Sequence, residues 1–220
     1  MATNKELAGK GLQIMKLIMI NDNPMDQNIY LYFDEKTNEG VIIDPGSSRV
    51  SSIEKIINDN NIKLEAILLT HSHYDHIGAV QEIKSLTGAT IYCHEAEKPL
   101  LEDPKLNLSK YSSEIEFSPD KVFADGEVYT IANTKIKVLH TPGHTQGCCC
   151  FYDAKNANLF SGDTLFRETV GRTDLPTSDT SSLLEGIKEK LFSLPDDTKV
   201  YPGHGLSSTI GHEKRFNPLF

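Results

Sequence analysis

Residues 67–76 read Ile-Leu-Leu-Thr-His-Ser-His-Tyr-Asp-His, so an apolar run passes directly into a cluster of potential metal ligands. The run Ala66–Thr70 is short and apolar, which is typical of a buried strand. Neutral imidazoles bind zinc or iron well, and a carboxylate offsets part of the charge of the ion. The stretch therefore predicts a divalent-metal site in the loop after a strand. The potential ligands within its last six residues are His71, His73, Asp75 and His76.

The same arrangement recurs three times further along the chain. In each case an apolar stretch ends in a Gly- or Thr-rich loop that carries a His or an Asp, namely His144, Asp163 and His204. Strand ends hold loops rigidly and glycines permit close approach, so these loops can converge at one rim of packed sheets. A six-residue loop cannot place four donors comfortably on one ion. With three more donors downstream, the seven suit two adjacent ions better than one.

Apolar periodicity along the rest of the chain predicts two packed sheets with helices outside. Residues 40–70 predict a βαβ unit, whose helix follows the capping residues Ser47 and Ser48, and one later hairpin is predicted to turn at Asn133-Thr134. No linker divides the chain, so residues 1–220 are expected to form a single domain, with 103–120 as a surface excursion. The predicted strands are 12–20, 28–33, 40–43, 66–70, 90–93, 127–132, 135–140, 147–152, 157–161 and 199–201, and the predicted helices are 50–60, 77–86, 95–101 and 183–192.

Composition excludes several classes of protein. The 220 residues are 38% hydrophobic and 24% charged, as in ordinary globular proteins. Lys and Arg number 22 against 31 Asp and Glu, a net charge of −9 without a basic run, so no nucleic-acid partner is expected. No apolar stretch is long enough to span a bilayer and 12–20 is a poor secretory signal, so no membrane partner is expected. The cysteines, Cys93 and the triplet Cys148–Cys150, form no disulfide framework, which favours a cytoplasmic location.

The motif HxHxDH at residues 71–76, with the later His and Asp residues at strand ends, resembles the metallo-β-lactamase superfamily. The resemblance implies an α+β fold, the αββα sandwich, with the metal site at one edge of two mixed sheets. It also implies two divalent metal ions, with zinc favoured and iron or manganese as alternatives. It assigns His71, His73 and His144 to the first metal, Asp75, His76 and His204 to the second, and Asp163 to both as a bridge.

Further segments are similar to the small glyoxalase II-like, or hydroxyacylglutathione hydrolase-like, enzymes. These segments are Gly162–Phe166, Gly171–Pro176 and Gly211–Glu213. Glyoxalase II itself carries a C-terminal helical domain that grips glutathione. Only 16 residues follow His204, so that domain is expected to be absent. Many zinc β-lactamases have Cys where this chain has Asp163, which argues against an antibiotic hydrolase.

The resemblance implies hydrolysis of an acyl thioester, of the S-2-hydroxyacyl thiol type, by a metal-bound hydroxide. Asp75 would be the catalytic residue that orients the nucleophile and relays its proton. The substrate is expected to be a small molecule, and the sequence specifies neither its acyl group, nor its thiol carrier, nor the oligomeric state. Candidate substrate contacts are Tyr74, for which packing is an equal alternative, and Arg172, which alternatively pairs internally with Asp174.

Two other classes of function stay open. The persulfide dioxygenases share this fold and a segment like Gly171–Asp174, and they place one iron on the equivalents of His71, His144 and Asp163. The other class is a non-catalytic metal-binding fold, against which the complete set of donors counts.

The remaining histidines have simpler interpretations. His94, His140 and His212 are interpreted as hydrogen-bonded structural or surface residues, with an orienting role near the site as the alternative for His140. The cysteine triplet is interpreted as strand packing, because a free cysteine behaves as a small apolar residue.

Overall fold

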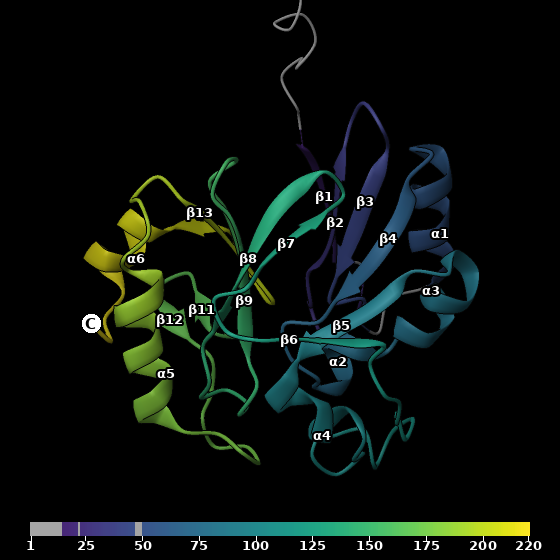
Figure 1. Ribbon diagram of the computed structural model, residues 1–220. Coiled ribbons are helices and arrows are strands. Elements are labelled where there is room, and N and C mark those ends of the chain that lie inside the picture. The colour runs from purple at the N-terminus through teal and green to yellow at the C-terminus, as the bar shows by residue number, and fades with distance from the viewer. Residues whose placement is uncertain (1–14, 22, 47–49) are drawn as a thin grey trace, which may run out of the picture.

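The computed structural model describes residues 15–21, 23–46 and 50–220, and within them the chain builds two six-stranded β-sheets that pack face to face. Helices cover the outer face of each sheet, so the layers run helix, sheet, sheet, helix (Figure 1). The predicted α+β sandwich is therefore confirmed. Two expectations lie outside the described residues: the first three residues of the strand predicted over 12–20, and the capping role of Ser47 and Ser48.

The first sheet is mixed and has the order β1-β2-β3-β4-β5-β6. Its first three strands pair antiparallel, and the strands from β3 to β6 pair parallel. The parallel pair β3 and β4, with a helix between them, confirms the predicted βαβ unit. The elements are β1 (Met15–Ile20), β2 (Ile29–Asp34), β3 (Glu39–Ile43), α1 (Val50–Asp59), β4 (Lys63–Leu68), α2 (Tyr74–Ile77), α3 (Val80–Thr87), β5 (Thr90–His94), the 3-10 turn η1 (Glu95–Glu97), α4 (Lys98–Leu101) and β6 (Lys121–Phe123).

The second sheet has the order β14-β13-β10-β9-β8-β7. Its strands pair antiparallel except β10 and β13, which are parallel and are joined by a crossover through a helix. The elements are β7 (Val128–Ile131), β8 (Thr134–His140), β9 (Cys149–Asp153), β10 (Asn158–Gly162), the two-stranded ribbon β11 (Leu165–Phe166) and β12 (Thr169–Val170), α5 (Thr180–Gly186), the π-helical turn η2 (Ile187–Leu191), β13 (Lys199–Pro202), β14 (Ser208–Thr209) and α6 (Ile210–Phe216).

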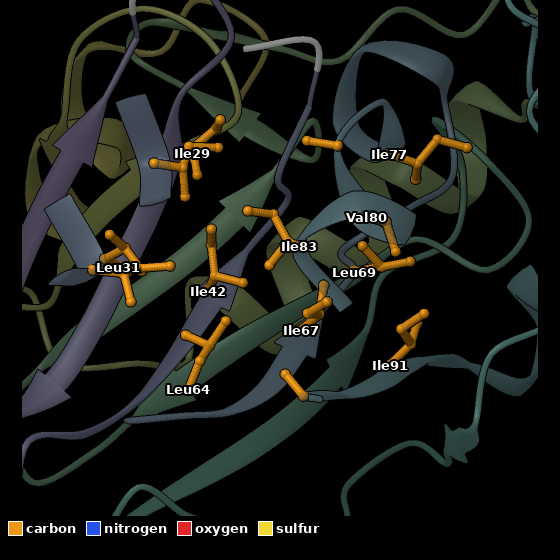
Figure 2. Close-up of a cluster of buried hydrophobic side chains, with 14 of the residues drawn as sticks. Ile29, Leu31, Ile42, Leu64, Ile67, Leu69, Ile77, Val80, Ile83 and Ile91 are labelled. Atoms are coloured by element: carbon orange, nitrogen blue, oxygen red, sulfur yellow. The ribbon is translucent and has the colours of Figure 1, made fainter. Parts of the chain in front are cut away.

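Three apolar clusters fill the three interfaces between these four layers. The first packs the first sheet against α1 and α3 and includes Ile42 and Ile83 (Figure 2). The second lies between the sheets and includes Ile43 and Phe151, and the third packs the second sheet against α5 through Leu183. Successive strand residues point to opposite faces, so Ile42 and Ile43 enter different clusters. Strands buried on both faces therefore read as continuous apolar runs in the sequence.

Some predicted elements have other limits in the structure. The helix predicted over 77–86 is divided at Gly78 and Ala79 into α2 and α3 and already begins at Tyr74. The helix predicted over 183–192 begins at Thr180, because the side chain of Asp179 caps it by accepting a hydrogen bond from Ser182 N at 2.7 Å.

Two further differences have local causes. The hairpin between β7 and β8 turns at Ala132-Asn133, not at Asn133-Thr134, and both turn residues have a positive φ, 50° and 61°, as a type I′ turn requires. Helix α6 is not predicted, because Gly211 and the polar residues after it give little apolar periodicity. The Thr209 side chain caps it by accepting from His212 N at 3.1 Å.

The described residues contain no helix long and apolar enough to cross a bilayer. All four cysteines are buried and free. Cys149 packs between the sheets and Cys150 packs toward α5, so neighbours in the triplet do point to opposite faces.

Candidate metal centre

The seven side chains predicted as metal donors lie together at one end of the sandwich, where strands of both sheets end. The first sheet supplies four of them, on the loop and helix that follow β4. The second sheet supplies three, from the β8–β9 loop and from the residues after β10 and β13. We call them the donor cluster: His71, His73, Asp75, His76, His144, Asp163 and His204.

Backbone pairing brings these loops together. The two sheets are joined beside the donor cluster, where Cys149 N donates to the carbonyl of Thr70 at 2.9 Å. Within the second sheet β10 and β13 run parallel, so Asp163 and His204, which follow them, leave the sheet at the same edge. The convergence of loops predicted from the strand-end pattern is thus found in the structure.

Gly203 makes this close approach possible. Its N–H donates to the carbonyl of Gly162 at 2.8 Å, which holds it against the end of β10. A Cβ at this position would collide with the carboxylate of Asp163 and would lie 2.7 Å from the His76 ring. Any side chain here would push the loop of His204 away from the rest of the donor cluster.

His71, His73 and His144 form the first group of donors. One ring nitrogen of each lies within 4.8 Å of the others, and His73 Nδ1 is 2.9 Å from His144 Nε2. The Nε2 atoms of His71 and His73 are buried and have no hydrogen-bond partner. Burial, together with the neighbouring imidazoles, lowers the pKa of His71 well below its ordinary value and that of His73 to about 3. These rings are therefore neutral near pH 7 and have the free lone pairs that a metal ion requires.

Asp75, His76 and His204 form the second group, whose ligand atoms also lie within 4.8 Å of one another. His204 Nε2 is 3.2 Å from Asp75 Oδ2 and 3.4 Å from His76 Nε2. Burial alone would lower the pKa of His204, but the hydrogen bond with Asp75 and the charge of Asp163 raise it. The carboxylates of Asp75 and Asp163 thus favour positive charge in this group. A bound metal ion would supply that charge in place of protons.

Asp163 lies between the two groups. Its Oδ1 is 3.4 Å from His76 Nε2, and its Oδ2 is 3.5 Å from His144 Nε2. Burial would raise the pKa of Asp163, but the charge of His76 outweighs it and holds the pKa below its ordinary value. Oδ1 is also buried without a hydrogen-bond partner. Because buried polar atoms are seldom unsatisfied, the unpartnered atoms of His71 and Asp163 fit a metal centre and fit no hydrogen-bonded network of the described residues.

In three histidines the ring nitrogen that points away from the donor cluster, Nδ1, is hydrogen-bonded to an oxygen. His144 Nδ1 donates to the carbonyl of Arg172 at 2.8 Å and His204 Nδ1 to that of Met25 at 3.1 Å. His76 Nδ1 is 3.0 Å from Asp44 Oδ2. Such bonds fix the tautomer and leave each Nε2 facing the donor cluster.

Asp44 was not predicted from the sequence. Besides His76, its carboxylate accepts hydrogen bonds from Thr70 N at 2.8 Å and Thr70 Oγ1 at 2.6 Å. Its oxygens also lie near His71 and His76 as a potential ligand group, but three hydrogen bonds already occupy them. Asp44 directly follows strand β3, so the same strand-end pattern that marks the donors would have found it.

Glu97 is a second polar residue that the sequence did not indicate. Its side chain is fully buried and accepts hydrogen bonds from Ser72 N at 2.8 Å, Ser72 Oγ at 2.6 Å and Thr145 Oγ1 at 2.8 Å. Burial raises the pKa of this carboxyl, against the lowering effect of these bonds. Ser72 lies between His71 and His73, and Thr145 follows His144. Glu97 therefore joins the two loops of the first donor group.

A cavity of about 530 Å³ opens onto the donor cluster. Five of its lining residues belong to the cluster: His73, Asp75, His144, Asp163 and His204. The others are mostly apolar: Met25, Tyr74, Leu108, Phe166, Thr169, Val170, Arg172 and Leu175. The segment 103–120, expected to be a surface excursion, thus contributes a wall of the cavity through Leu108.

Both predicted substrate contacts line this cavity. Arg172 makes a bidentate ion pair with Asp174, at 2.7 Å from Nε and 2.8 Å from Nη2, so the internal ion pair named as its alternative is present, and its role as a substrate contact stays a prediction. The Tyr74 hydroxyl donates to Met25 Sδ at 3.7 Å, and its backbone N–H donates to the carbonyl of Asn107 at 2.9 Å.

The three remaining histidines have other partners. His94 and His140 stack with ring centroids 3.9 Å apart, and His94 Nδ1 accepts from Ala96 N at 3.3 Å. His212 pairs with Glu168 at 2.9 Å. None of the three lines the cavity, which agrees with their interpretation as structural or surface residues.

Comparison with known proteins identifies the family of this chain. A sequence profile described as the metallo-beta-lactamase superfamily matches residues 22–204. A curated relative, hydroxyacylglutathione hydrolase GloC of Haemophilus influenzae, is 36% identical over 209 residues, which cover 93% of this chain and 98% of the relative.

Two solved structures are similar over their whole length. The BLEG-1 B3 metallo-beta-lactamase superposes with a TM-score of 0.87 at 37% identity, covering 94% of this chain and 99% of the other. TTHA1623 in a di-iron-bound form superposes with a TM-score of 0.81 at 36% identity, covering 92% and 100%.

Proposed function

This chain belongs to the metallo-β-lactamase superfamily and is a metallo-hydrolase, and from this we propose that it hydrolyses acyl thioesters in the manner of glyoxalase II. One observation carries the proposal: seven His and Asp donors, of which His71 and Asp163 have buried unsatisfied atoms, converge at a cavity large enough for a small molecule. The likeness to the curated GloC supports a thioester as the substrate.

We propose that the donor cluster holds two divalent ions, with zinc favoured and iron or manganese as alternatives. The chemistry that such ions supply when bound is a hydroxide nucleophile near neutral pH and polarisation of the substrate carbonyl. Asp163, which lies between the two donor groups, would be shared by both ions. The first ion would be held by His71, His73 and His144, and the second by Asp75, His76 and His204.

Asp75 is the proposed catalytic residue. It lines the cavity, and its Oδ2 is 3.2 Å from His204 Nε2. Burial would raise its pKa, but the charge of His76 and the hydrogen bond from His204 lower it, so the carboxylate is ionised at neutral pH. An ionised carboxylate at the cavity surface can orient the attacking water and accept its proton. A thiolate leaves readily, so no strong general acid is required.

Arg172 and Tyr74 are proposed substrate contacts. The Arg172 guanidinium is exposed and its partner Asp174 is exposed as well, so this ion pair is weak and can exchange for a substrate carboxylate. The Tyr74 hydroxyl at the cavity wall can donate to a substrate oxygen.

Two alternative activities have support. A persulfide dioxygenase would place one iron on His71, His144 and Asp163, and the likeness to a di-iron-bound structure favours iron as an acceptable ion. The likeness to BLEG-1 supports β-lactam hydrolysis, and Asp163, which stands where many zinc β-lactamases have Cys, counts against it. A non-catalytic fold is disfavoured because the donor cluster is complete.

The test is a substrate panel with purified protein loaded in turn with zinc, iron and manganese. The panel contains S-lactoylglutathione, other acyl thioesters, a chromogenic β-lactam, and glutathione persulfide with oxygen uptake as the readout. We expect thioester turnover that chelation abolishes and that falls by roughly 10²- to 10⁴-fold in Asp75→Asn. Absence of metal-dependent turnover on every thioester would reject the proposal, and oxygen uptake by the iron form would assign the dioxygenase activity instead.

A further inference from the structure

Leu108 has a backbone conformation that is unusual for its side chain. Its φ is 66°, in the left-handed region where Gly, Asn and Asp are the common residues. The residue is partly buried and is one of those that line the cavity at the donor cluster. A leucine kept in a strained conformation at a cavity wall suggests that its side chain has a role there.

Two buried polar residues impose this conformation. The carbonyl of Asn107 accepts from Tyr74 N at 2.9 Å, and its Nδ2 donates to the carbonyl of Ile115 at 2.8 Å. Ser109 N donates to Asn107 Oδ1 at 3.0 Å, and Ser109 Oγ accepts from Ile115 N at 2.8 Å. Leu108, between them, is therefore fixed to α2, the helix that carries Asp75 and His76.

The wall to which Leu108 belongs is apolar. It includes Met25, Phe166, Val170 and Leu175, which come from the β1–β2 loop, the β11–β12 ribbon and the segment before α5. The segment after α4 and the segment before α5 lie at the same end of the sandwich as α2 (Figure 1). Among the described lining residues the single Lys or Arg is Arg172, whose side chain is 63% exposed and paired with Asp174.

We propose that Leu108 determines acyl specificity, and that the acyl group of the substrate is an uncharged aliphatic or aromatic group packed against this wall. The inference rests on the proposed thioesterase function. The reacting carbonyl must lie at the donor cluster, and the polar thiol carrier leaves past exposed Arg172 toward water. The partly buried apolar wall is then the part of the cavity that remains for the acyl group. A charged acyl group would lose its hydration there without gaining a partner.

Leu108→Asn is the decisive variant. Asn has nearly the shape of Leu and tolerates a positive φ, so the fold should be kept and the melting temperature should not fall. Leu108→Gly, which also suits this φ, removes the contribution of this side chain to the wall. Tyr111→Ser is the matched control, because Tyr111 is 93% exposed on the same segment and does not line the cavity.

The measurement is kcat/KM for acetyl, propionyl, butanoyl, hexanoyl and succinyl thioesters of one small neutral thiol, with a parallel series in which only the thiol is lengthened. In the wild type and in Tyr111→Ser we expect kcat/KM to rise roughly fourfold for each added acyl methylene until the wall is covered, with succinyl below butanoyl. In both Leu108 variants the rise should flatten, so that hexanoyl loses at least about tenfold while acetyl changes less than about twofold.

The outcomes separate the two proposals. Absence of turnover with every thioester, S-lactoylglutathione included, would refute the proposed function itself, whereas turnover confined to S-lactoylglutathione would overturn the specificity inference alone. Turnover with no dependence on acyl length, a dependence on thiol length instead, a preference for succinyl, or an unchanged slope in Leu108→Asn would each overturn the specificity inference and leave thioester hydrolysis standing.

Discussion

At the scale of single residues, Glu97 controls the donor cluster without being one of its donors. It joins the loop of His71 and His73 to the loop of His144 through Ser72 and Thr145. A glutamine here cannot satisfy all three donors. One of the two carboxylate oxygens becomes an NH2 group, which donates where an acceptor is needed.

Glu97→Gln should therefore loosen metal binding. We expect the dissociation constant for zinc to become about ten to a hundred times larger. The free energy of unfolding should fall by about 1–3 kcal/mol, because buried donors lose their acceptor. Competition with a chromophoric chelator measures the first and urea unfolding the second. Glu102→Gln, which changes an exposed residue on the same segment, is the control. Unchanged zinc affinity would show that Glu97 does not position the loops.

His94 makes the stability depend on pH. Burial, and then the adjacent His140, lower its pKa to about 4; Asp125 opposes this with a smaller raising effect, and Lys190 adds a smaller lowering one. In the unfolded chain a histidine has a pKa of about 6.5. Between these values the unfolded state binds the proton and the folded state does not, so the free energy of unfolding falls as the pH drops from about 6.5 toward 4.

His94→Asn should reduce this acid sensitivity. Asn keeps a cap acceptor for Ala96 N but does not titrate. For chelator-treated protein, the loss of unfolding free energy between about pH 7 and pH 5 should be smaller in the variant by up to about 2 kcal/mol. Urea unfolding at the two pH values measures it. Equal losses in both proteins would mean that His94 is not the responsible group.

At the scale of elements, the parallel pair β10 and β13 sets the spacing of Asp163 and His204, and Gly203 allows the loops to touch. Gly203→Ala should lower zinc occupancy and cut thioester turnover by at least about tenfold, because the added Cβ overlaps the Asp163 carboxylate. Metal analysis of the purified variant with parallel kinetics provides the measurement.

The control for this variant is Gly186→Ala in α5. A Cβ at Gly186 meets Thr141 at 3.6 Å, an ordinary contact. It should raise helix stability by up to about 1 kcal/mol and leave metal content unchanged. If Gly203→Ala also keeps full metal content and activity, the close approach at Gly203 is not needed for the site.

Prediction from the sequence succeeds where the information is local. The donor cluster follows from donors placed after apolar strands, and the two sheets follow from runs such as Ala66–Thr70. Glu97 escapes prediction because its partners Ser72 and Thr145 lie 25 and 48 residues away. Leu108 could not be predicted, because the sequence of a turn-rich stretch does not show which residue lines a cavity. Helix α6 escapes because capping by Thr209, rather than apolar periodicity, starts it.

At the scale of the whole molecule, removal of metal should destabilise the chain. At a free ion concentration a thousandfold above the dissociation constant, one bound ion adds about 4 kcal/mol to the free energy of unfolding. For a chain of this size that corresponds to a melting temperature higher by on the order of 10 °C. Calorimetry before and after chelation, with zinc restored in one sample and calcium in another, tests this. Zinc should restore the melting temperature and calcium should not, because imidazole ligands disfavour calcium. A melting temperature indifferent to chelation would contradict the proposed centre.

The division of the donors between the sheets has a consequence for a nicked polypeptide. The exposed turn at Asp125-Gly126 separates the strand β6 from β7, and a break there leaves four donors on one fragment and three on the other. Neither fragment carries all the donors of either group. Their reassociation would therefore respond to the activity of zinc in the medium, and the chain could be made into a split reporter in which complementation reads out the free ion.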